Sequence, residues 1–237
     1  ELLSSEVPDT AKQAAIELDK VVKTPHGKQT VLAHPKGISR LLKLLSSRSA
    51  SAARWAVRVI ASLSMDASGR QRVCALSSVK GDAVALALTK LLSCHDVESE
   101  QCAALVLGNL VLDPVGREML LRAPCVLPAV RDVLWTSDVK TLRYIAGALR
   151  NVSFDEAGGR RLLSDRLLIK RLQELISSPD PTTVRYVSAV LKNMKVNVES
   201  KGPRSPTFRH VATAGDDGPG RGPTSPKRQM MSSSLAP

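Results

Sequence analysis

Three stretches of this chain, Leu107-Gly108-Asn109, Leu149-Arg150-Asn151 and Leu191-Lys192-Asn193, share one pattern and follow one another at intervals of 42 residues. The same register continues 47 residues before Asn109, where Ser62 takes the place of the asparagine. A period of this length is typical of a helical solenoid, in which each unit buries its apolar face only against its neighbours. The four positions are called the rungs, and their units are numbered one to four along the chain.

Other columns of residues keep the same register. A glycine recurs at intervals of 42, 47 and 42, namely at Gly27, Gly69, Gly116 and Gly158. An apolar residue ends a block 17 positions before each rung, namely at Leu45, Leu92, Leu134 and Ile176. Unit two therefore holds its 5 extra residues between Gly69 and Leu92, and we place them in the polar stretch 77–82. Columns that agree independently on one register predict a true structural repeat.

Within a unit, the apolar spacing predicts three helices. In unit three these are residues 117–122, 126–135 and 139–153, and the last of them has apolar residues at helical spacing from Leu142 to Val152. Turn residues separate the helices, and Asp138 is a helix-start signal before the third one. No segment alternates polar and apolar residues over the length of a strand. The expected fold class is therefore all-α.

The second-helix blocks Ile38-Ser-Arg-Leu-Leu-Lys-Leu-Leu45 and Val126-Leu-Pro-Ala-Val-Arg-Asp-Val-Leu134, with the third-helix ending Ala148-Leu-Arg-Asn151-Val, resemble the armadillo repeats of importin-alpha and the catenins. The resemblance covers roughly residues 1–197. It implies a right-handed superhelical solenoid of about four complete three-helix repeats after a truncated N-terminal repeat. We expect the truncated repeat at 1–36 and the others at about 37–78, 79–125, 126–167 and 168–197.

The first residues extend this register backwards. The string Leu44-Leu45-Ser46-Ser47 recurs 42 residues earlier as Leu2-Leu3-Ser4-Ser5, which places Lys20 on a rung. We therefore expect the chain to start in the last turn of a second helix, as a fragment of a longer solenoid whose first helix exposes an apolar face. The alternative is a degenerate natural cap.

The composition changes after residue 197. Residues 198–237 are rich in Pro, Gly and Ser, and we expect them to be a disordered basic tail because they cannot bury enough apolar surface. The tail holds Ser205 and Ser225, each followed by proline, as candidate phosphorylation sites. It has 6 Lys/Arg and 3 Asp/Glu, so most of the net charge of +12 belongs to residues 1–197.

Several classes of function have no sequence support. The four His residues are scattered through loops or the tail, no nucleophile turn or phosphate loop is present, and Cys74, Cys94, Cys102 and Cys125 match no zinc spacing. We expect no enzyme, cofactor, metal or small-molecule substrate. No apolar run approaches the ~18 residues of a membrane span. The free cysteines favour a reducing intracellular location, cytoplasmic or nuclear.

The third helices carry the candidate binding residues, because in armadillo-like folds they line the concave side. Positions seven before each rung lie about 20° from it on a helix, and they include two tyrosines; basic residues gather at about 40° to 100° on the other side. The predicted peptide-binding residues are Ser62, Asn109, Asn151, Asn193, Arg54, Arg58, Arg143, Tyr144, Arg150, Arg185, Tyr186 and Lys192.

The chemistry of such a face suits an extended peptide. An asparagine side chain can bond both N–H and C=O of a passing backbone, whereas arginine binds carboxylate or phosphate through its fork and tyrosine adds contact area. We therefore predict a protein partner that offers an extended, acidic or phosphorylated segment. In the alternative interpretation the asparagines bond neighbouring loops, the arginines are solvated and the aromatics belong to the core.

Other functions rank lower. Importin-alpha places Trp four residues before the rung, where this chain has Arg58, Leu105, Gly147 and Ala189, so the resemblance does not extend to a nuclear-import adaptor for basic cargo. A rigid scaffold in a cytoskeletal or ciliary assembly is the main alternative. Nucleic-acid binding ranks below it, because the sequence shows no nucleic-acid module and few aromatic residues for stacking.

Overall fold

The structure is a computed structural model that describes residues 2–5, 7–80 and 82–199. Within these residues it is all-helical, as predicted. After a short 3-10 helix, η1 (Leu2–Ser4), the α-helices are α1 (Pro8–Val21), α2 (Pro25–Ala33), α3 (Gly37–Leu44), α4 (Ala50–Ser64), α5 (Ala67–Lys80), α6 (Ala83–Leu92), α7 (Val97–Leu110), α8 (Pro114–Arg122), α9 (Val126–Val133), α10 (Val139–Ser153), α11 (Glu156–Leu163), α12 (Arg166–Leu175) and α13 (Pro181–Glu199). The predicted tail, with Ser205 and Ser225, lies outside the described residues from position 200 onward.

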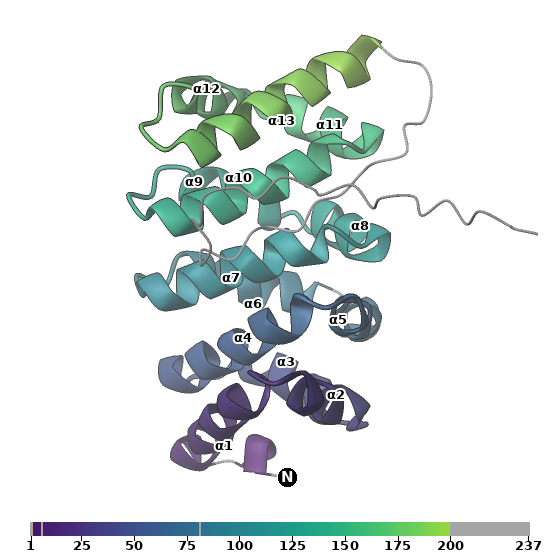
Figure 1. Cartoon of the computed structure of the whole chain (residues 1–237), viewed down its shortest axis with the longest axis vertical. Coiled ribbons are helices and arrows are strands. Elements are labelled where there is room, and N and C mark those ends of the chain that lie inside the picture. Colours follow the sequence, from purple (N-terminus) through teal and green to yellow (C-terminus); the bar gives the residue numbers. More distant parts are fainter. Residues whose placement is uncertain (1, 6, 81, 200–237) are drawn as a thin grey trace, which may run out of the picture.

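The helices form three parallel stacks along one elongated solenoid (Figure 1). The third helices α1, α4, α7, α10 and α13 follow one another along one face, and each packs on the next. The first helices α2, α5, α8 and α11 lie along one side of this stack (Figure 1). The second helices α3, α6, α9 and α12 complete units one to four, while η1 and α1 form the truncated unit.

One continuous core of Leu, Val, Ile and Ala runs through all units. The third helices supply much of it: Ala56, Ile60 and Leu63 of α4 are all 0% exposed. Small residues let neighbouring third helices approach closely, which is why a chain with 3% aromatic residues can still fill its interior.

The irregularity of unit two lies in its first helix. Helix α5 has 14 residues, whereas the first helices α2 and α8 have 9 each. The 5 additional residues thus lengthen α5 at its C-terminal end and leave the stacking of the units intact. This matches the predicted position between Gly69 and Leu92.

The recurring glycine marks the place where a first helix crosses the end of the preceding third helix. A Cβ atom added to Gly158 would overlap the carbonyl oxygen of Val152, and one added to Gly69 would overlap that of Leu63. In each case the carbonyl belongs to the residue just after a rung. Only glycine leaves room for this crossing. The first helices α2, α8 and α11 begin at side-chain caps. In α11, for example, the Asp155 carboxylate accepts from the Gly158 N–H at 3.1 Å.

Consecutive third helices are joined by a repeating polar contact. An aspartate caps the N-terminus of α7, α10 and α13, at Asp96, Asp138 and Asp180 respectively. The residue eight positions before the preceding rung donates to the same carboxylate: Arg54 to Asp96 at 2.9 Å, Gln101 to Asp138 at 3.1 Å and Arg143 to Asp180 at 2.6 Å. Each capping aspartate therefore links its own third helix to the third helix before it. We call this contact the junction bond.

No helix of the described residues is long and apolar enough to cross a membrane. Within the same residues, no group of three or more His, Cys, Asp and Glu side chains is arranged to hold a metal ion.

The glycine crossing predicts an asymmetry between two Gly→Ala substitutions. Gly158→Ala should lower the free energy of unfolding by about 2 kcal/mol, because the new methyl group collides with a backbone carbonyl that cannot rotate away. The matched control is Gly37→Ala, where the added Cβ would lie 3.1 Å from the nearest backbone oxygen and the change should stay within about 1 kcal/mol. Urea denaturation monitored by circular dichroism measures both; equal effects would contradict the crossing model.

The junction bond predicts a pH dependence at Asp180. The bond from Arg143, with further bonds from Thr183, holds the pKa of Asp180 well below its usual range. A carboxyl group with a lowered folded-state pKa adds stability above its unfolded pKa of about 3.9, and this contribution is lost as the pH falls below that value. Asp180→Ala should therefore cost about 2 kcal/mol at pH 7. Urea denaturation of both proteins should show the difference shrinking steadily below pH 4; a constant difference would contradict the assignment.

Candidate peptide-binding face

The four rungs lie in the C-terminal halves of α4, α7, α10 and α13. These helices follow one another in the third-helix stack (Figure 1). Asn109 and Asn151 are each 1% exposed, whereas Ser62 and Asn193 are half-buried. The stack thus places the sequence-predicted residues on one layer of the molecule.

Two of the asparagines bond the preceding unit. The Asn109 side-chain amide donates to the Ser64 hydroxyl at 3.1 Å, and that of Asn193 donates to the Ser153 hydroxyl at 3.0 Å. Both serines lie two residues after the preceding rung and in turn donate to a carbonyl of their own helix. Asn109 and Asn193 therefore have the structural role that the sequence left open as the alternative. The serine column at positions 64 and 153 was a usable signal that the sequence analysis missed.

Three of the predicted basic residues are neutralised by carboxylates of neighbouring units. Arg54 and Arg143 make junction bonds, as described above. Arg58 pairs with Asp19 of α1 at 3.0 Å and also with Glu98 of α7, so it spans three consecutive third helices. Arg58 also stacks on the Trp55 ring, with its guanidinium carbon 4.6 Å from the ring centre. The charges of these three arginines are therefore compensated within the chain.

The remaining basic residues gather at the other end. The guanidinium carbons of Arg150 and Arg185 lie 5.6 Å and 5.2 Å from the centre of the Tyr186 ring, on α10 and α13. Arg150 also lies 5.7 Å from the Phe154 ring. Arg185 and Lys192 are exposed, and within the described residues neither makes an ion pair. We call Arg150, Arg185, Tyr186 and Lys192 the basic–aromatic cluster.

The aromatic column is largely internal. Tyr144 is 8% and Tyr186 is 6% exposed, while Trp55 and Cys102 are partly buried against the core. Burial raises the pKa of the Cys102 thiol to about 11 and that of Cys74 to about 12, so both stay protonated and unreactive near neutral pH.

Comparisons with known proteins support the fold and no finer identity. No family model and no curated protein matches the sequence. Among solved structures, a designed armadillo repeat protein in complex with the peptide (KR)4 is similar, with a TM-score of 0.68, 18% identity, and coverage of 81% of this chain and 79% of that one. A computationally designed armadillo repeat protein for modular peptide recognition has a TM-score of 0.70 at 18% identity, with coverage of 81% and 79%. An engineered protein has a TM-score of 0.69 at 20% identity and covers 82% and 78%.

At these identities the likeness concerns the fold alone. Together with the 42-residue register and the three stacks of helices, it shows that the described residues form an armadillo-type α-solenoid, as the sequence resemblance implied.

Proposed function

We propose that the third-helix face binds an extended segment of a partner protein, with an acidic or phosphorylated residue of that segment held at the basic–aromatic cluster. The observation that carries this proposal is the contrast between the two halves of the face. Arg54, Arg58 and Arg143 are paired with carboxylates of their own chain, whereas Arg185 and Lys192 face solvent without an ion-pair partner among the described residues.

An extended backbone suits the spacing of the stack. Neighbouring third helices lie about 10 Å apart, and an extended chain advances about 3.3 Å per residue, so each unit would serve two to three residues of the ligand. An asparagine whose amide already donates to a serine still has a side-chain oxygen, which can accept from a peptide N–H. The structural bond from Asn193, which is half-buried, would then orient this side chain for the ligand, whereas Asn109 is 1% exposed and serves the packing of the units.

The expected ligand differs from that of the designed neighbour. That protein is described with the basic peptide (KR)4. Here, a basic peptide would meet the like charges of Arg150, Arg185 and Lys192, which costs binding energy. A carboxylate or phosphate would instead accept charge-assisted bonds from these side chains, and both Arg150 and Arg185 lie over the same Tyr186 ring.

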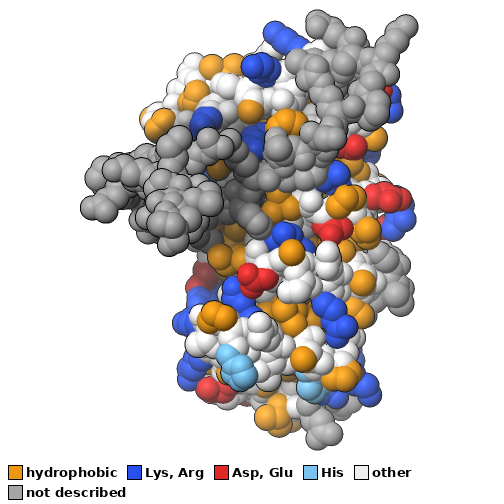
Figure 2. All heavy atoms as spheres, turned by 45° about the vertical axis from the view of Figure 1, so that its right-hand side comes forward, with side chains coloured by type: hydrophobic (Ala, Val, Ile, Leu, Met, Phe, Trp, Pro, Cys, Tyr) orange, Lys and Arg blue, Asp and Glu red, His pale blue; other side chains and the backbone are white. Residues whose placement is uncertain are grey.

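A rigid scaffold is the second candidate, and a specific observation favours it. The junction bonds and the Asn–Ser bonds use the same residues that a peptide would contact, and they connect every unit from α4 to α13. Direct nucleic-acid binding has less support: on the side that Figure 2 shows, Lys and Arg are interspersed with acidic and hydrophobic side chains and form no continuous basic patch.

A double substitution tests the peptide proposal. Asn193→Ala combined with Arg185→Ala should weaken binding to acidic extended peptides by about tenfold or more, because it removes the half-buried rung asparagine of α13 and one of the three cations of the cluster. The measurement is fluorescence anisotropy with a panel of acidic, phosphorylated, neutral and basic peptides. Arg122→Ala combined with Gln71→Ala is the control, since both residues are exposed on the first helices.

Binding of acidic peptides that the double substitution leaves unchanged would refute the site. If no peptide binds, and substitutions outside the third-helix face abolish capture of a partner, the scaffold function is favoured instead. Tight binding of arbitrary oligonucleotides with a steep salt dependence would support the nucleic-acid class.

A further inference from the structure

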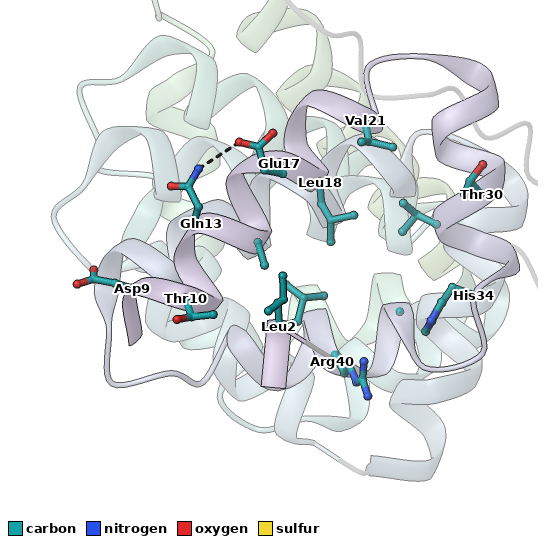
Figure 3. Close-up of a pocket in the computed structure, with 14 residues that line it drawn as sticks. Leu2, Asp9, Thr10, Gln13, Glu17, Leu18, Val21, Thr30, His34 and Arg40 are labelled. Atoms are coloured by element: carbon teal, nitrogen blue, oxygen red, sulfur yellow. Dashed lines mark hydrogen bonds between the residues drawn. The ribbon is translucent and has the colours of Figure 1, made fainter. Parts of the chain in front are cut away.

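The first unit holds an apolar cavity of about 820 Å³ lined by residues of η1, α1, α2 and α3, and Leu2 and Leu18 point into it (Figure 3). This cavity opens at the first described helices, and nothing in the structure indicates what would fill it. A smaller cleft lies between two complete units, where the corner between α11 and α12 meets the start of α9.

This second cleft, at the junction of units three and four, has a volume of about 400 Å³. We call it the corner cleft, and its lining residues include Leu127 and Pro128 of α9, Arg161 of α11, and Arg166 and Leu167 of α12. Leu167 is 62% exposed, which is unusual for a leucine in a folded domain. Ligand clefts typically hold about 300–1,000 Å³, so this one suits a short segment of chain.

The floor of the corner cleft adjoins the core. Leu127 and Arg161 also line an apolar cavity of about 40 Å³ among residues of α7, α8, α9, α10 and α11. A cavity of about 150 Å³ takes up benzene, so this one has room for the end of one aliphatic side chain. An apolar group that enters the corner cleft can therefore bury its end beside Leu127.

The two arginines of the corner cleft are exposed, and neither makes an ion pair among the described residues. Asp165 also lines the cleft, but its carboxylate is already bound. It accepts from the Leu168 N–H at 3.0 Å as the cap of α12, and it lies 3.4 Å from the Arg131 guanidinium. Arg161 and Arg166 therefore give the cleft a positive charge that the described part of the chain does not compensate.

The preceding junction shows that the repeat fold does not require such a cleft. The counterpart of Arg161 one unit earlier is Met119, which is 2% exposed. The counterpart of Leu127 is Ala85, which is 0% exposed. The same place is thus closed by apolar residues in one junction and is open and charged in the next.

We infer that the corner cleft binds a short segment of a partner protein in which an aliphatic side chain and a carboxylate lie one or two positions apart. The aliphatic side chain packs against Leu127 and Leu167. The carboxylate accepts charge-assisted bonds from Arg161 and Arg166. A bare phosphate or a nucleic-acid backbone would use the charges and leave the apolar surface in water. The lining residues lie outside the third helices, so this site is separate from the proposed peptide-binding face.

Titration of the isotope-labelled full chain with short peptides, followed by amide chemical shifts, tests this inference. The probe is an acetylated tetrapeptide with Leu next to Asp, and two matched probes replace Leu by Ala or Asp by Asn. The first probe should shift amides within residues 124–128 and 161–167. Each matched probe should bind about tenfold more weakly, because it lacks either the buried aliphatic group or the charge.

Charge reversal identifies the residues that hold the carboxylate. Arg161→Glu and Arg166→Glu should each weaken binding of the first probe by about tenfold or more, because each places a like charge against it. The matched control is Arg72→Glu, since Arg72 is the exposed counterpart of Arg161 in unit two. Arg185→Ala, in the basic–aromatic cluster, should also leave this binding unchanged, which separates the two sites. Circular dichroism spectra of the variants, expected to match the unsubstituted protein, distinguish a lost contact from a folding defect.

Several results would overturn the inference. Shifts confined to α10 and α13 would assign the peptide to the third-helix face instead. The inference also fails if no amide shifts at about 5 mM peptide, or if neither charge reversal weakens binding. Equally strong binding of inorganic phosphate, an oligonucleotide or anionic lipid vesicles at these arginines would replace the partner protein by another class of ligand. Association of the unliganded chain in sedimentation velocity, abolished by Arg161→Glu, would make a second copy the occupant.

Discussion

The arrangement of this solenoid depends on one contact, the carboxylate that caps a third helix and is also bound by the third helix before it. An N-cap alone stabilises a helix by about 1 kcal/mol and does not position it relative to a neighbour. Because Arg54, Gln101 and Arg143 each reach forward to the next cap, the starts of the third helices α7, α10 and α13 are fixed against the preceding third helix. Apolar packing supplies most of the stability, and the junction bond supplies the register.

This use of charge shapes the surface that remains for binding. Residues that form a basic stripe on a helical wheel are divided by the fold into two groups. Arg54, Arg58 and Arg143 are held by carboxylates, whereas Arg185 and Lys192 are exposed and make no ion pair among the described residues. A repeat protein can therefore carry a marked excess of positive charge and still present it at only one part of a face. We therefore expect an anionic ligand to bind beside Arg185 and Lys192.

Much of the fold follows from periodicity in the sequence. The glycine and rung columns predict the units, the number of helices in each and the position of the insertion, because these depend on spacing alone. Helix ends were less well predicted: the first helix of unit three begins at Pro114 rather than 117, since Asp113 caps it and proline suits the first helical position. The ion pairs could not be predicted in the same way. The carboxylate partners of Arg54, Arg58 and Arg143 lie 37 to 42 residues away, and which one an arginine reaches depends on the offset between neighbouring helices.

The rung asparagines combine a structural role within the protein with a predicted role in ligand binding. Their recurrence shows that one environment is repeated, and Ser64 and Ser153 show that part of this environment lies within the protein. The structure thus supplies an orienting bond for residues whose ligand contact stays a prediction.

Native-state hydrogen exchange on an Arg143→Ala variant tests the central role of the junction bond most directly. Removal of this side chain breaks the contact between α10 and the cap of α13. Protection of the α13 amides should then fall, by about 1–2 kcal/mol in opening free energy, while α4 and α7 keep theirs. Unchanged protection in α13, or an equal loss in all four helices, would contradict a stack held in register by bonds between neighbouring units.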